Sequence, residues 1–486
     1  MSGLSVETSI PLPSDVFILI MQHLTYDDML TLRCTCKLLY ALVHEYGWSA
    51  YLRLHDRPSF SLRKARYSWD ALTRARYDAL SDRAWSKARS IARPLSRPWA
   101  GKLQPHLAMS PSRLLVAAGS KIYAFKIKMN PKKEYAPGMI SEATYILNHP
   151  DRIKRDITSL VFTPDDGLDR TVFAGFANGA IERIVLPIIS QDEASTVTIY
   201  LPQDSYTFHG GDLIESMSCS GNSLLSVSSL GLASLCNLTS HPLTPSFINL
   251  HCKSWCSYLS LKASSPFTAF GISSASPLSV YPITGNSLSK TPSAHLQSRN
   301  PRKFSAVYGI SGAPISSPWG GSENILISGW YDGAVCVHDL RSSSRTSQDD
   351  IRGTAPLLPV LSLEDPWCPE PIYSVGCGGG SSSHIAAGSA RHSVVAFWDV
   401  RSPSRGWSIH APGNDVSPVY SVILESSRLF GATQSRPFVY DFGPGVTEAT
   451  YPVLPPSPNR LDDTLRMKKN GPGYYVTRYN HRRTQE

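Results

Sequence analysis

From about residue 106 onward, the sequence repeats one kind of unit at intervals of roughly 45 to 60 residues. Each unit holds two short apolar segments separated by a turn rich in Gly, Ser or Asn, with a further short apolar segment before and after most pairs. Short strands at regular spacing, without helical patterns between them, predict antiparallel sheets built from successive hairpins. Seven pairs can be aligned, and they begin near residues 113, 170, 222, 267, 324, 384 and 428.

We therefore expect residues 106–455 to have a mainly β fold, a seven-bladed β-propeller whose blades are four-stranded antiparallel sheets. Three of the third segments end in HDLR (338–341), WDVR (398–401) and YD (440–441). These endings resemble the Trp-Asp pair of WD-repeat proteins, and the resemblance implies a surface that binds other proteins. Two segments compete to close the ring: residues 449–454, and an extended stretch near Leu95.

The first 54 residues carry a helical pattern instead. Apolar Val16, Ile20 and Leu24 follow one another at four-residue steps, and Ser14 stands where a helix N-cap is expected. A second start signal follows at 25–28, whose carboxylates suit a helix N-terminus. Residues 10–54 are therefore expected to form a small all-α domain.

This helical segment resembles the F-box. The resemblance rests on the Leu-Pro start at 12–13, the sequence LTYDDMLTL at 24–32, the Cys-Lys pair at 36–37 and the closing Trp48. The family usually has valine and tryptophan at two positions that here hold Thr35 and Leu39.

The F-box resemblance implies that the segment binds the Skp-type adaptor of a ubiquitin ligase and, through the adaptor, a cullin-RING core. An amphipathic helix laid in an apolar groove is the physical basis of such binding. The resemblance implies that the contact residues are Leu12, Pro13, Val16, Ile20, Leu24, Leu30 and Leu32. The alternative is that these residues pack a helical cap onto the sheets.

Residues 55–105 read as a basic helical connector between the two parts. Between Ser61 and Leu95 there is no Gly, the first Pro is Pro94, and Ala, Arg, Leu and Lys dominate, which favours helix. Residues 61–102 hold eleven Lys or Arg against three Asp. A second basic stretch follows in the C-terminal tail, 456–486. Either stretch could bind an anionic partner or be an ordinary solvated face.

A substrate protein is expected to bind where the loops between second and third strands meet those leading into each first strand. Arg and aromatic residues are typical of protein-binding hot spots, and clustered guanidinium groups also suit a phosphorylated peptide. The candidates in these loops are Arg152, Lys154, Arg155, Trp255, Arg302, Lys303, Trp330, Tyr331, Arg391 and Arg436.

No motif for catalysis, cofactor binding or membrane insertion stands out. We find no Walker loop, no GxSxG elbow and no HExxH, so we expect a binding protein, without a small-molecule substrate, rather than an enzyme. The apolar run VFILIM at 16–21 is too short to span a membrane. Nine cysteines without a CxxC pair indicate reduced thiols, which favours the cytoplasm or nucleus. His251, Cys252 and Cys256 lack a fourth ligand at zinc spacing, so no metal is expected.

Together these features predict the substrate-recognition subunit of an SCF-type ubiquitin ligase. Two alternatives remain open. The HDLR and WDVR endings also resemble the WDxR motif of receptors for the damaged-DNA-binding adaptor of another cullin ligase, which would make Arg341 and Arg401 contacts. The second alternative is a scaffold that binds nucleic acid or another anionic partner through the basic connector and tail.

Overall fold

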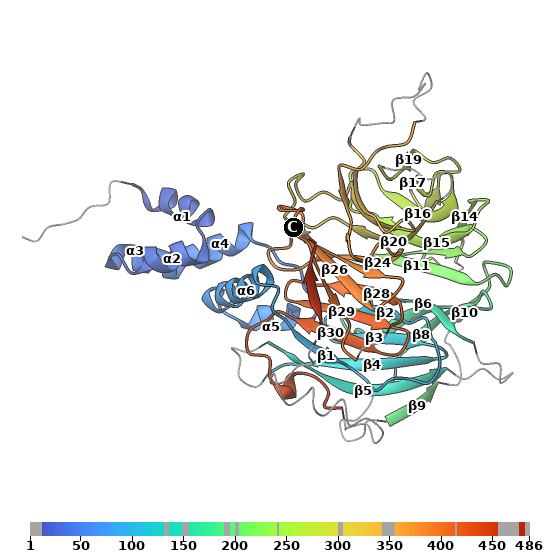
Figure 1. Ribbon diagram of the computed structural model, residues 1–486, viewed down its shortest axis with the longest axis horizontal. Coiled ribbons are helices and arrows are strands. Elements are labelled where there is room, and N and C mark those ends of the chain that lie inside the picture. The colour runs from blue at the N-terminus through green and yellow to red at the C-terminus, as the bar shows by residue number, and fades with distance from the viewer. Residues whose placement is uncertain are drawn as a thin grey trace, which may run out of the picture.

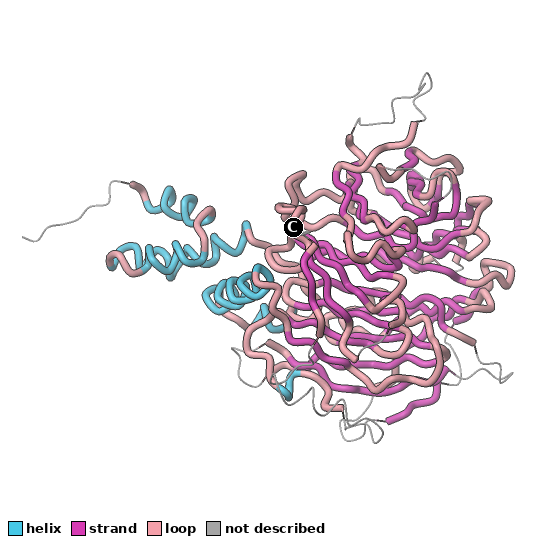
Figure 2. The backbone as a smooth tube through the Cα atoms, viewed as in Figure 1, coloured by secondary structure: helices cyan, strands magenta, loops and turns pink. Residues whose placement is uncertain are grey.

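The computed structural model describes residues 12–130, 136–147, 155–188, 195–199, 204–240, 243–299, 305–342, 355–413, 416–454 and 476–481. Strands dominate, and the α-helices lie at the N-terminal end (Figure 1, Figure 2). The protein is therefore mainly β with a helical N-terminal part, as the hydrophobic pattern predicts. No helix among the described residues is long and apolar enough to cross a bilayer.

The N-terminal helices stand to one side of the sheets (Figure 1). Thr25 caps the second helix: its hydroxyl accepts a hydrogen bond from the Asp28 amide, and the Asp28 carboxylate accepts one from the Thr25 amide. The predicted N-cap at Ser14 is wrong by one residue, because Pro13 already has the extended backbone of a cap. The elements are α1 (Ser14–Gln22), α2 (Tyr26–Arg33), α3 (Lys37–Leu42), the π-helical turn η1 (Val43–Gly47) and α4 (Trp48–Leu54).

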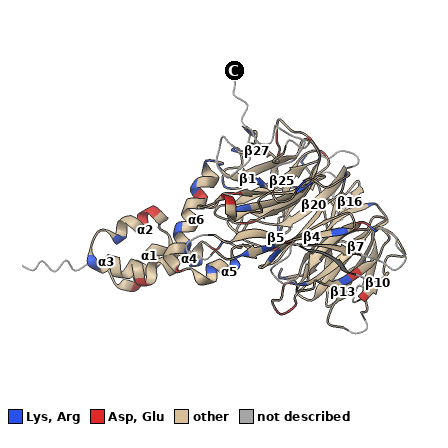
Figure 3. Ribbon diagram, turned by 90° about the horizontal axis from the view of Figure 1, so that it is seen from below, with Lys and Arg blue, Asp and Glu red and all other residues tan. Residues whose placement is uncertain are grey.

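The connector consists of α5 (Arg63–Ser68) and α6 (Ala71–Ser86), followed by the strand β1 (Ile91–Pro94). Asp70 caps α6 by accepting a hydrogen bond from the Thr73 amide at 2.6 Å. The last helix of the connector ends at Ser86, and β1 begins at Ile91, so the helical part ends before the predicted limit near Leu95. Along α6, two basic residues (Arg74, Arg76) are followed by two acidic residues (Asp78, Asp82) and then by Arg83, so α6 carries both charges (Figure 3).

Among the described residues, the strands form seven four-stranded antiparallel units. Within each unit the chain runs through a first, second and third strand in order, and the second strands begin at or next to the predicted positions. The first strands are β2 (His106–Met109), β6 (Ile157–Phe162), β11 (Ile214–Ser220), β15 (Ser254–Ser260), β20 (Ser305–Gly312), β24 (Ile372–Gly378) and β28 (Val419–Leu424). The second strands are β3 (Arg113–Ala118), β7 (Thr171–Phe176), β12 (Ser223–Ser228), β16 (Phe267–Ser274), β21 (Ile325–Trp330), β25 (His384–Ser389) and β29 (Arg428–Thr433).

Third and fourth strands complete the units. The third strands are β4 (Lys121–Lys128), β8 (Ile181–Val185), β13 (Leu232–Asn237), β17 (Leu278–Thr284), β22 (Val335–Asp339), β26 (Val394–Asp399) and β30 (Pro437–Asp441). The fourth strands are β5 (Gly138–Leu147), β10 (Asp204–Tyr206), β14 (Ser246–Asn249), β19 (Ala294–Leu296), β23 (Leu361–Leu363), β27 (Trp407–His410) and β1. Three further strands extend the edges: β9 (Ser195–Ile199), β18 (Ser287–Leu288) and β31 (Arg478–Asn480).

The last unit takes its fourth strand from the connector. Residues Ile91–Pro94 pair antiparallel with β30, so the stretch near Leu95 is the one that joins the end of the chain to its beginning. The competing segment, 449–454, contains only the short 3₁₀ turn η2 (Glu448–Thr450). The strand β9 follows β8 of the second unit in the chain, where the blade pattern predicts a fourth strand, but it pairs parallel with β5 of the first unit instead.

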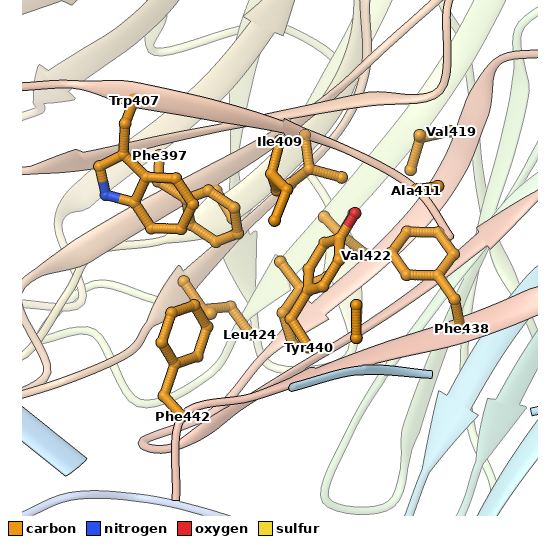
Figure 4. Close-up of a cluster of buried hydrophobic side chains, with 14 of the residues drawn as sticks. Phe397, Trp407, Ile409, Ala411, Val419, Val422, Leu424, Phe438, Tyr440 and Phe442 are labelled. Carbon is orange, nitrogen blue, oxygen red and sulfur yellow. The ribbon is translucent and has the colours of Figure 1, made fainter. Parts of the chain in front are cut away.

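Successive units are neighbours in space. Each first strand contacts the next, from β2 through β28, and β28 in turn contacts β2. No described sheet closes on itself; a short pairing of β16 with β20 joins two units into a nine-stranded sheet. Buried apolar clusters fill the space between neighbouring units, as Figure 4 shows for Phe397, Trp407, Val419 and Phe438. Successive residues of a strand belong to clusters on opposite faces of the sheet: in β3, Leu114 and Val116 lie in one cluster and Leu115 and Ala117 in another. Both faces of the sheet are therefore buried.

Part of the C-terminal tail is held at the edge of the sixth unit. β31 pairs with β27, and its neighbour His481 hydrogen-bonds Ser408 through Nε2 at 2.8 Å. The Ser408 hydroxyl also donates to the Asp365 carboxylate at 2.6 Å, and so does Tyr479 at 2.9 Å. Ser408, His481 and Asp365 are all buried, so we assign this set to fixing the tail strand.

Substituting Asp365 with Asn is expected to lower the free energy of unfolding at pH 7 by about 1.5 to 3 kcal/mol. Burial by itself would raise the pKa of Asp365, but hydrogen bonds from His481, Ser408 and a backbone amide outweigh burial and lower it to about 2. The carboxylate therefore stabilises the fold above its ordinary pKa near 4, and this contribution is lost as pH falls toward 2.

Chemical denaturation of both proteins between pH 7 and pH 3 checks this expectation. The difference between wild type and Asp365→Asn should shrink at the acidic end. Asp204→Asn, in an exposed pair with Arg183, is the control and should change little. A difference that stays constant with pH would exclude the charge of Asp365 as the cause.

Candidate functional site

The N-terminal helices expose apolar side chains at their outer surface. Leu12, Leu19 and Ile20 are between 42 and 59% exposed, far more than a helix core permits. Leu38 and Tyr40 of α3 are also about half exposed. Apolar side chains left in water on a small helical domain are typical of a surface that a partner covers.

The residues expected to contact the adaptor divide into two groups. Leu12, Pro13 and Ile20 are exposed and Val16 is half-buried, so these side chains are accessible to a partner. Leu24, Leu30 and Leu32 are half-buried and pack against the helical core around Met21, Met29 and Trp48. Their main role in the free protein is therefore packing, while the exposed Leu19 was not among the sequence candidates.

The connector is fixed to the sheets by buried polar contacts. The Glu425 carboxylate, just after β28, accepts hydrogen bonds from the backbone amides of Phe60 and Ser61 and from the hydroxyls of Ser59 and Ser61. Arg57 donates to Asp82 at 2.8 Å and to the carbonyl oxygen of Gly380 at 3.3 Å. These contacts couple α6 to the sheets.

Aromatic packing reinforces this junction. Trp85 of α6 stacks on Phe442 with ring centroids 3.7 Å apart, and its indole nitrogen donates to the Ser426 carbonyl oxygen at 3.0 Å. A cavity of about 570 Å³, with Phe60, Tyr67 and Leu424 in its wall, lies between the connector and the last residues of the first strands. The connector therefore covers the end of the sheets where the first strands finish.

At the opposite end, where the first strands begin, equivalent positions recur around the units. In six first strands the pairing register shifts and leaves one bulged residue without a cross-strand partner. A bulge turns its side chain out of the regular ladder. The residue before each bulge is buried, whereas the bulged residues themselves are partly exposed: Thr158, Glu215, Trp255, Tyr308, Tyr373 and Tyr420.

Four consecutive bulges are aromatic and touch one another. The ring centroids lie 4.9 Å apart for Trp255 and Tyr308, 5.2 Å for Tyr308 and Tyr373, and 5.7 Å for Tyr373 and Tyr420. Tyr331, on the turn between β21 and β22, lies 6.3 Å from Tyr308 and is 47% exposed. We call these five residues the aromatic wall. A partly exposed aromatic surface of this kind supplies contact area at low entropic cost.

Charged groups stand at one edge of the aromatic wall. The Lys253 ammonium lies 4.0 Å from the centroid of the Trp255 ring. Glu215 is the bulged residue on the neighbouring first strand, and burial raises the pKa of its carboxyl to about 7 although Lys253 opposes this. Nearby Tyr308 and Tyr373 also have raised pKa values because of burial, so their hydroxyls remain neutral donors.

The residues predicted to bind a substrate fall into three groups: some lie at the aromatic wall, some lie outside the described residues, and some pack into the fold. Trp255 and Tyr331 belong to the aromatic wall, and Arg391 lies close enough to Tyr373 to influence its ionisation. Arg391 is exposed, with its Nε 3.7 Å from the Glu370 carboxylate. Four candidates lie outside the described residues: Arg152, Lys154, Arg302 and Lys303.

Three predicted substrate residues have side chains that are little exposed and serve the fold. Arg155 donates to Glu182 at 2.8 Å and covers the ring of Phe176. Trp330 is 1% exposed in the core between two units, and Arg436 is 7% exposed. The prediction that these three form a surface is wrong, because each side chain turns back from its loop into the sheets.

Tyr308, Tyr373 and Tyr420 are not among the site residues predicted from the sequence. A signal for them was present, since the first strands repeat one local pattern: VYGI (307–310), IYSV (372–375) and VYSV (419–422). The tyrosine follows a buried aliphatic residue each time, and three equivalent tyrosines on adjacent repeats indicate one shared surface.

Two other sequence candidates can now be placed. Arg341 and Arg401 are about half exposed. Each guanidinium forms an ion pair with the carboxylate two residues before it, Arg341 with Asp339 and Arg401 with Asp399. Among the described residues no group of three His, Cys, Asp or Glu side chains could hold a metal ion. Burial raises the pKa of Cys256 far above its usual range, which opposes the thiolate that zinc needs.

Comparison with known protein families assigns the N-terminal helices. The family model of the F-box domain matches residues 11–46, which span α1 to α3 and most of η1. The chain therefore carries an F-box domain, and F-box domains generally bind Skp-type adaptors. No curated protein matches the chain. Trp48, just beyond the match, is buried and packs 5.4 Å from Tyr26, so it stabilises the helical core.

Proposed function

We propose that the protein is the substrate-recognition subunit of an SCF-type ubiquitin ligase. The F-box domain would bind the Skp-type adaptor and, through it, the cullin-RING core, while the sheets would bind the substrate protein in the cytoplasm or nucleus. The observation that carries the proposal is the docked connector, which joins an F-box domain to sheets with an aromatic wall at their far end. Ubiquitin transfer itself would depend on the other subunits, with no catalytic residue from this chain.

We further propose that the seven units are the blades of a WD-repeat β-propeller. Support comes from the order of neighbouring first strands, which returns from β28 to β2, and from β1, which completes the last unit with a strand from before the first. A shared strand of this kind ties the two ends of a ring together. The aromatic wall would then line one part of the mouth of the central channel.

The position of the connector suits an adaptor. The aromatic wall lies where the first strands begin and the connector packs where they end, about 20 Å away along strands of six or seven residues. A substrate on the aromatic wall would therefore be held at a fixed distance from the F-box domain, because the connector is helical and docked rather than a flexible chain.

Adaptor binding is expected to depend on the exposed apolar residues of the F-box domain. The variant Leu12→Ala, Pro13→Ala, Ile20→Asp should lose the Skp-type adaptor, at least tenfold in recovery, since each buried aliphatic side chain contributes about 1.5 to 3 kcal/mol. These side chains are exposed, so the fold should survive the change. Affinity purification of both chains, with identification of the recovered subunits, measures the effect.

Leu230→Asp is the matched control for this purification, because Leu230 is 72% exposed but lies on the turn between β12 and β13, outside the F-box domain. It should recover the adaptor like wild type. Equal recovery by the triple variant would contradict the proposal. Recovery of the damaged-DNA-binding adaptor instead, abolished by Arg341→Ala and Arg401→Ala, would favour the WDxR alternative. Recovery of neither adaptor would favour a scaffold, whose anionic partners should dissociate between about 50 and 200 mM salt.

A further inference from the structure

The aromatic wall is one part of a ring of equivalent positions with an uneven composition. Following the first strands from β15 to β28, the bulged residues are all aromatic, from Trp255 to Tyr420. On the preceding strands they are Glu215 and Thr158. A ligand at this end of the strands would therefore meet several π faces and one carboxyl group.

The Glu215 carboxyl has no ion pair among the residues that the structure describes; burial raises its pKa, and the charges of Lys253 and Asp212 act on it in opposite directions. Asp212 is engaged elsewhere, because its carboxylate accepts hydrogen bonds from Ser229 and the Leu230 amide. A cation that approached the aromatic wall would find the carboxylate of Glu215 unpaired.

The aromatic wall already has a cation on one of its rings. Lys253 sits 4.0 Å over Trp255, which is within the range of a cation-π contact. Tyr308, Tyr373 and Tyr420 have partly exposed rings and no described cation over them. Among the described residues no cation covers these three rings, so they offer π faces to a cation that belongs to a ligand.

The arginines that the structure describes at this end are poorly placed to bind an anionic ligand. Arg155 is paired with Glu182, Arg436 is buried, and Arg391 lies beside Glu370. The side chains that project from the first strands at this end carry π faces and a carboxyl group instead. Among the described residues, the bulged side chains therefore offer more partners to a positive ligand than to a phosphorylated one.

Resting on the proposed substrate-binding role of this end of the sheets, we infer that the aromatic wall and Glu215 together bind an Arg or Lys side chain of the substrate protein. The cationic group stacks on the rings of Tyr308 and Tyr373, and the Glu215 carboxylate attracts it from the side. The aliphatic stem of the same side chain packs on the remaining aromatic surface.

The test uses the full chain and fluorescein-labelled degenerate peptide pools whose central residue is fixed as Arg, Lys, Leu or phosphoserine, measured by fluorescence anisotropy at pH 8. We expect the Arg and Lys pools to bind at least tenfold more tightly than the Leu and phosphoserine pools. Tyr373→Ala and Glu215→Gln should each weaken the Arg pool about tenfold. Tyr373→Phe keeps the π face and should bind like wild type, as should the control Leu168→Ala, whose exposed side chain lies on the loop between β6 and β7 at the other end of the strands.

Preference for the phosphoserine pool, equal binding of all pools, no binding above background, or indifference to Tyr373→Ala and Glu215→Gln would each overturn the inference. Adaptor recovery, measured on the same protein samples, is a separate readout. A chain that recovers the Skp-type adaptor but shows no preference for Arg or Lys disproves the inference alone. A chain that prefers Arg or Lys but recovers no adaptor disproves the ligase role alone.

Discussion

Substituting Arg428 with Met is expected to lower the free energy of unfolding by about 3 to 5 kcal/mol, because it leaves a buried carboxylate without its partner. Both side chains of the Arg428–Asp441 pair are fully buried, and the guanidinium Nε lies 3.0 Å from the Asp441 carboxylate. The same guanidinium donates to the Pro137 carbonyl oxygen at 2.7 Å. Equilibrium unfolding in urea, followed by tryptophan fluorescence, measures the loss.

A second ion pair in the same molecule provides the control for Arg428. Arg341 and Asp339 lie 2.8 Å apart, but the arginine side chain is half exposed, so Arg341→Met should cost less than about 1 kcal/mol. Replacing both buried partners, Arg428→Met with Asp441→Leu, should restore much of the stability, since no buried charge then remains unpaired. Equal losses for the buried and the exposed pair would mean that burial does not set the cost.

The sheets were largely predictable because their signal is local. A short apolar run between turn residues marks a strand wherever it occurs, so the second strands were placed to within a residue or two. The partner of a strand is not a local property. Ser195–Ile199 has strand residues, but nothing in its sequence distinguishes the edge of β5 from the edge of β8. Likewise β1 ends at Pro94, and its pairing with β30 depends on contacts more than 300 residues apart in the chain.

The candidate site was only partly predictable, for a related reason. Residue type and loop position identified Trp255 and Tyr331, but they also identified Trp330, one residue away and fully buried. Which of two adjacent side chains faces solvent depends on the turn geometry and on the core behind it. Tyr308, Tyr373 and Tyr420 lie in strands, where alternation alone assigns a face, and the bulges turn their side chains out of the regular ladder.

Trp85→Ala is expected to be similarly damaging, at about 3 to 5 kcal/mol, because it removes a large side chain from a site that cannot collapse around the cavity. Trp85 is 2% exposed, stacks on Phe442, lies 4.6 Å from His384 and donates to the Ser426 carbonyl oxygen. The loss should be concentrated at the junction, so hydrogen exchange should accelerate most in α6. Trp367→Ala, which removes a 54% exposed tryptophan whose indole nitrogen donates to the Asn480 carbonyl oxygen, should cost about 1 kcal/mol.

Because Trp85 fixes the connector without belonging to the F-box domain, its loss separates binding from positioning. Under the proposed function, Trp85→Ala should still recover the Skp-type adaptor, since the exposed face at Leu12 and Ile20 is intact. Ubiquitination of a bound substrate should nevertheless fall, because a detached connector no longer holds the substrate at one distance from the ligase core. Trp85→Phe keeps the stacking and should retain most of the activity. Full ubiquitination by Trp85→Ala, with α6 shown to exchange rapidly, would mean that the docked connector is not needed for transfer.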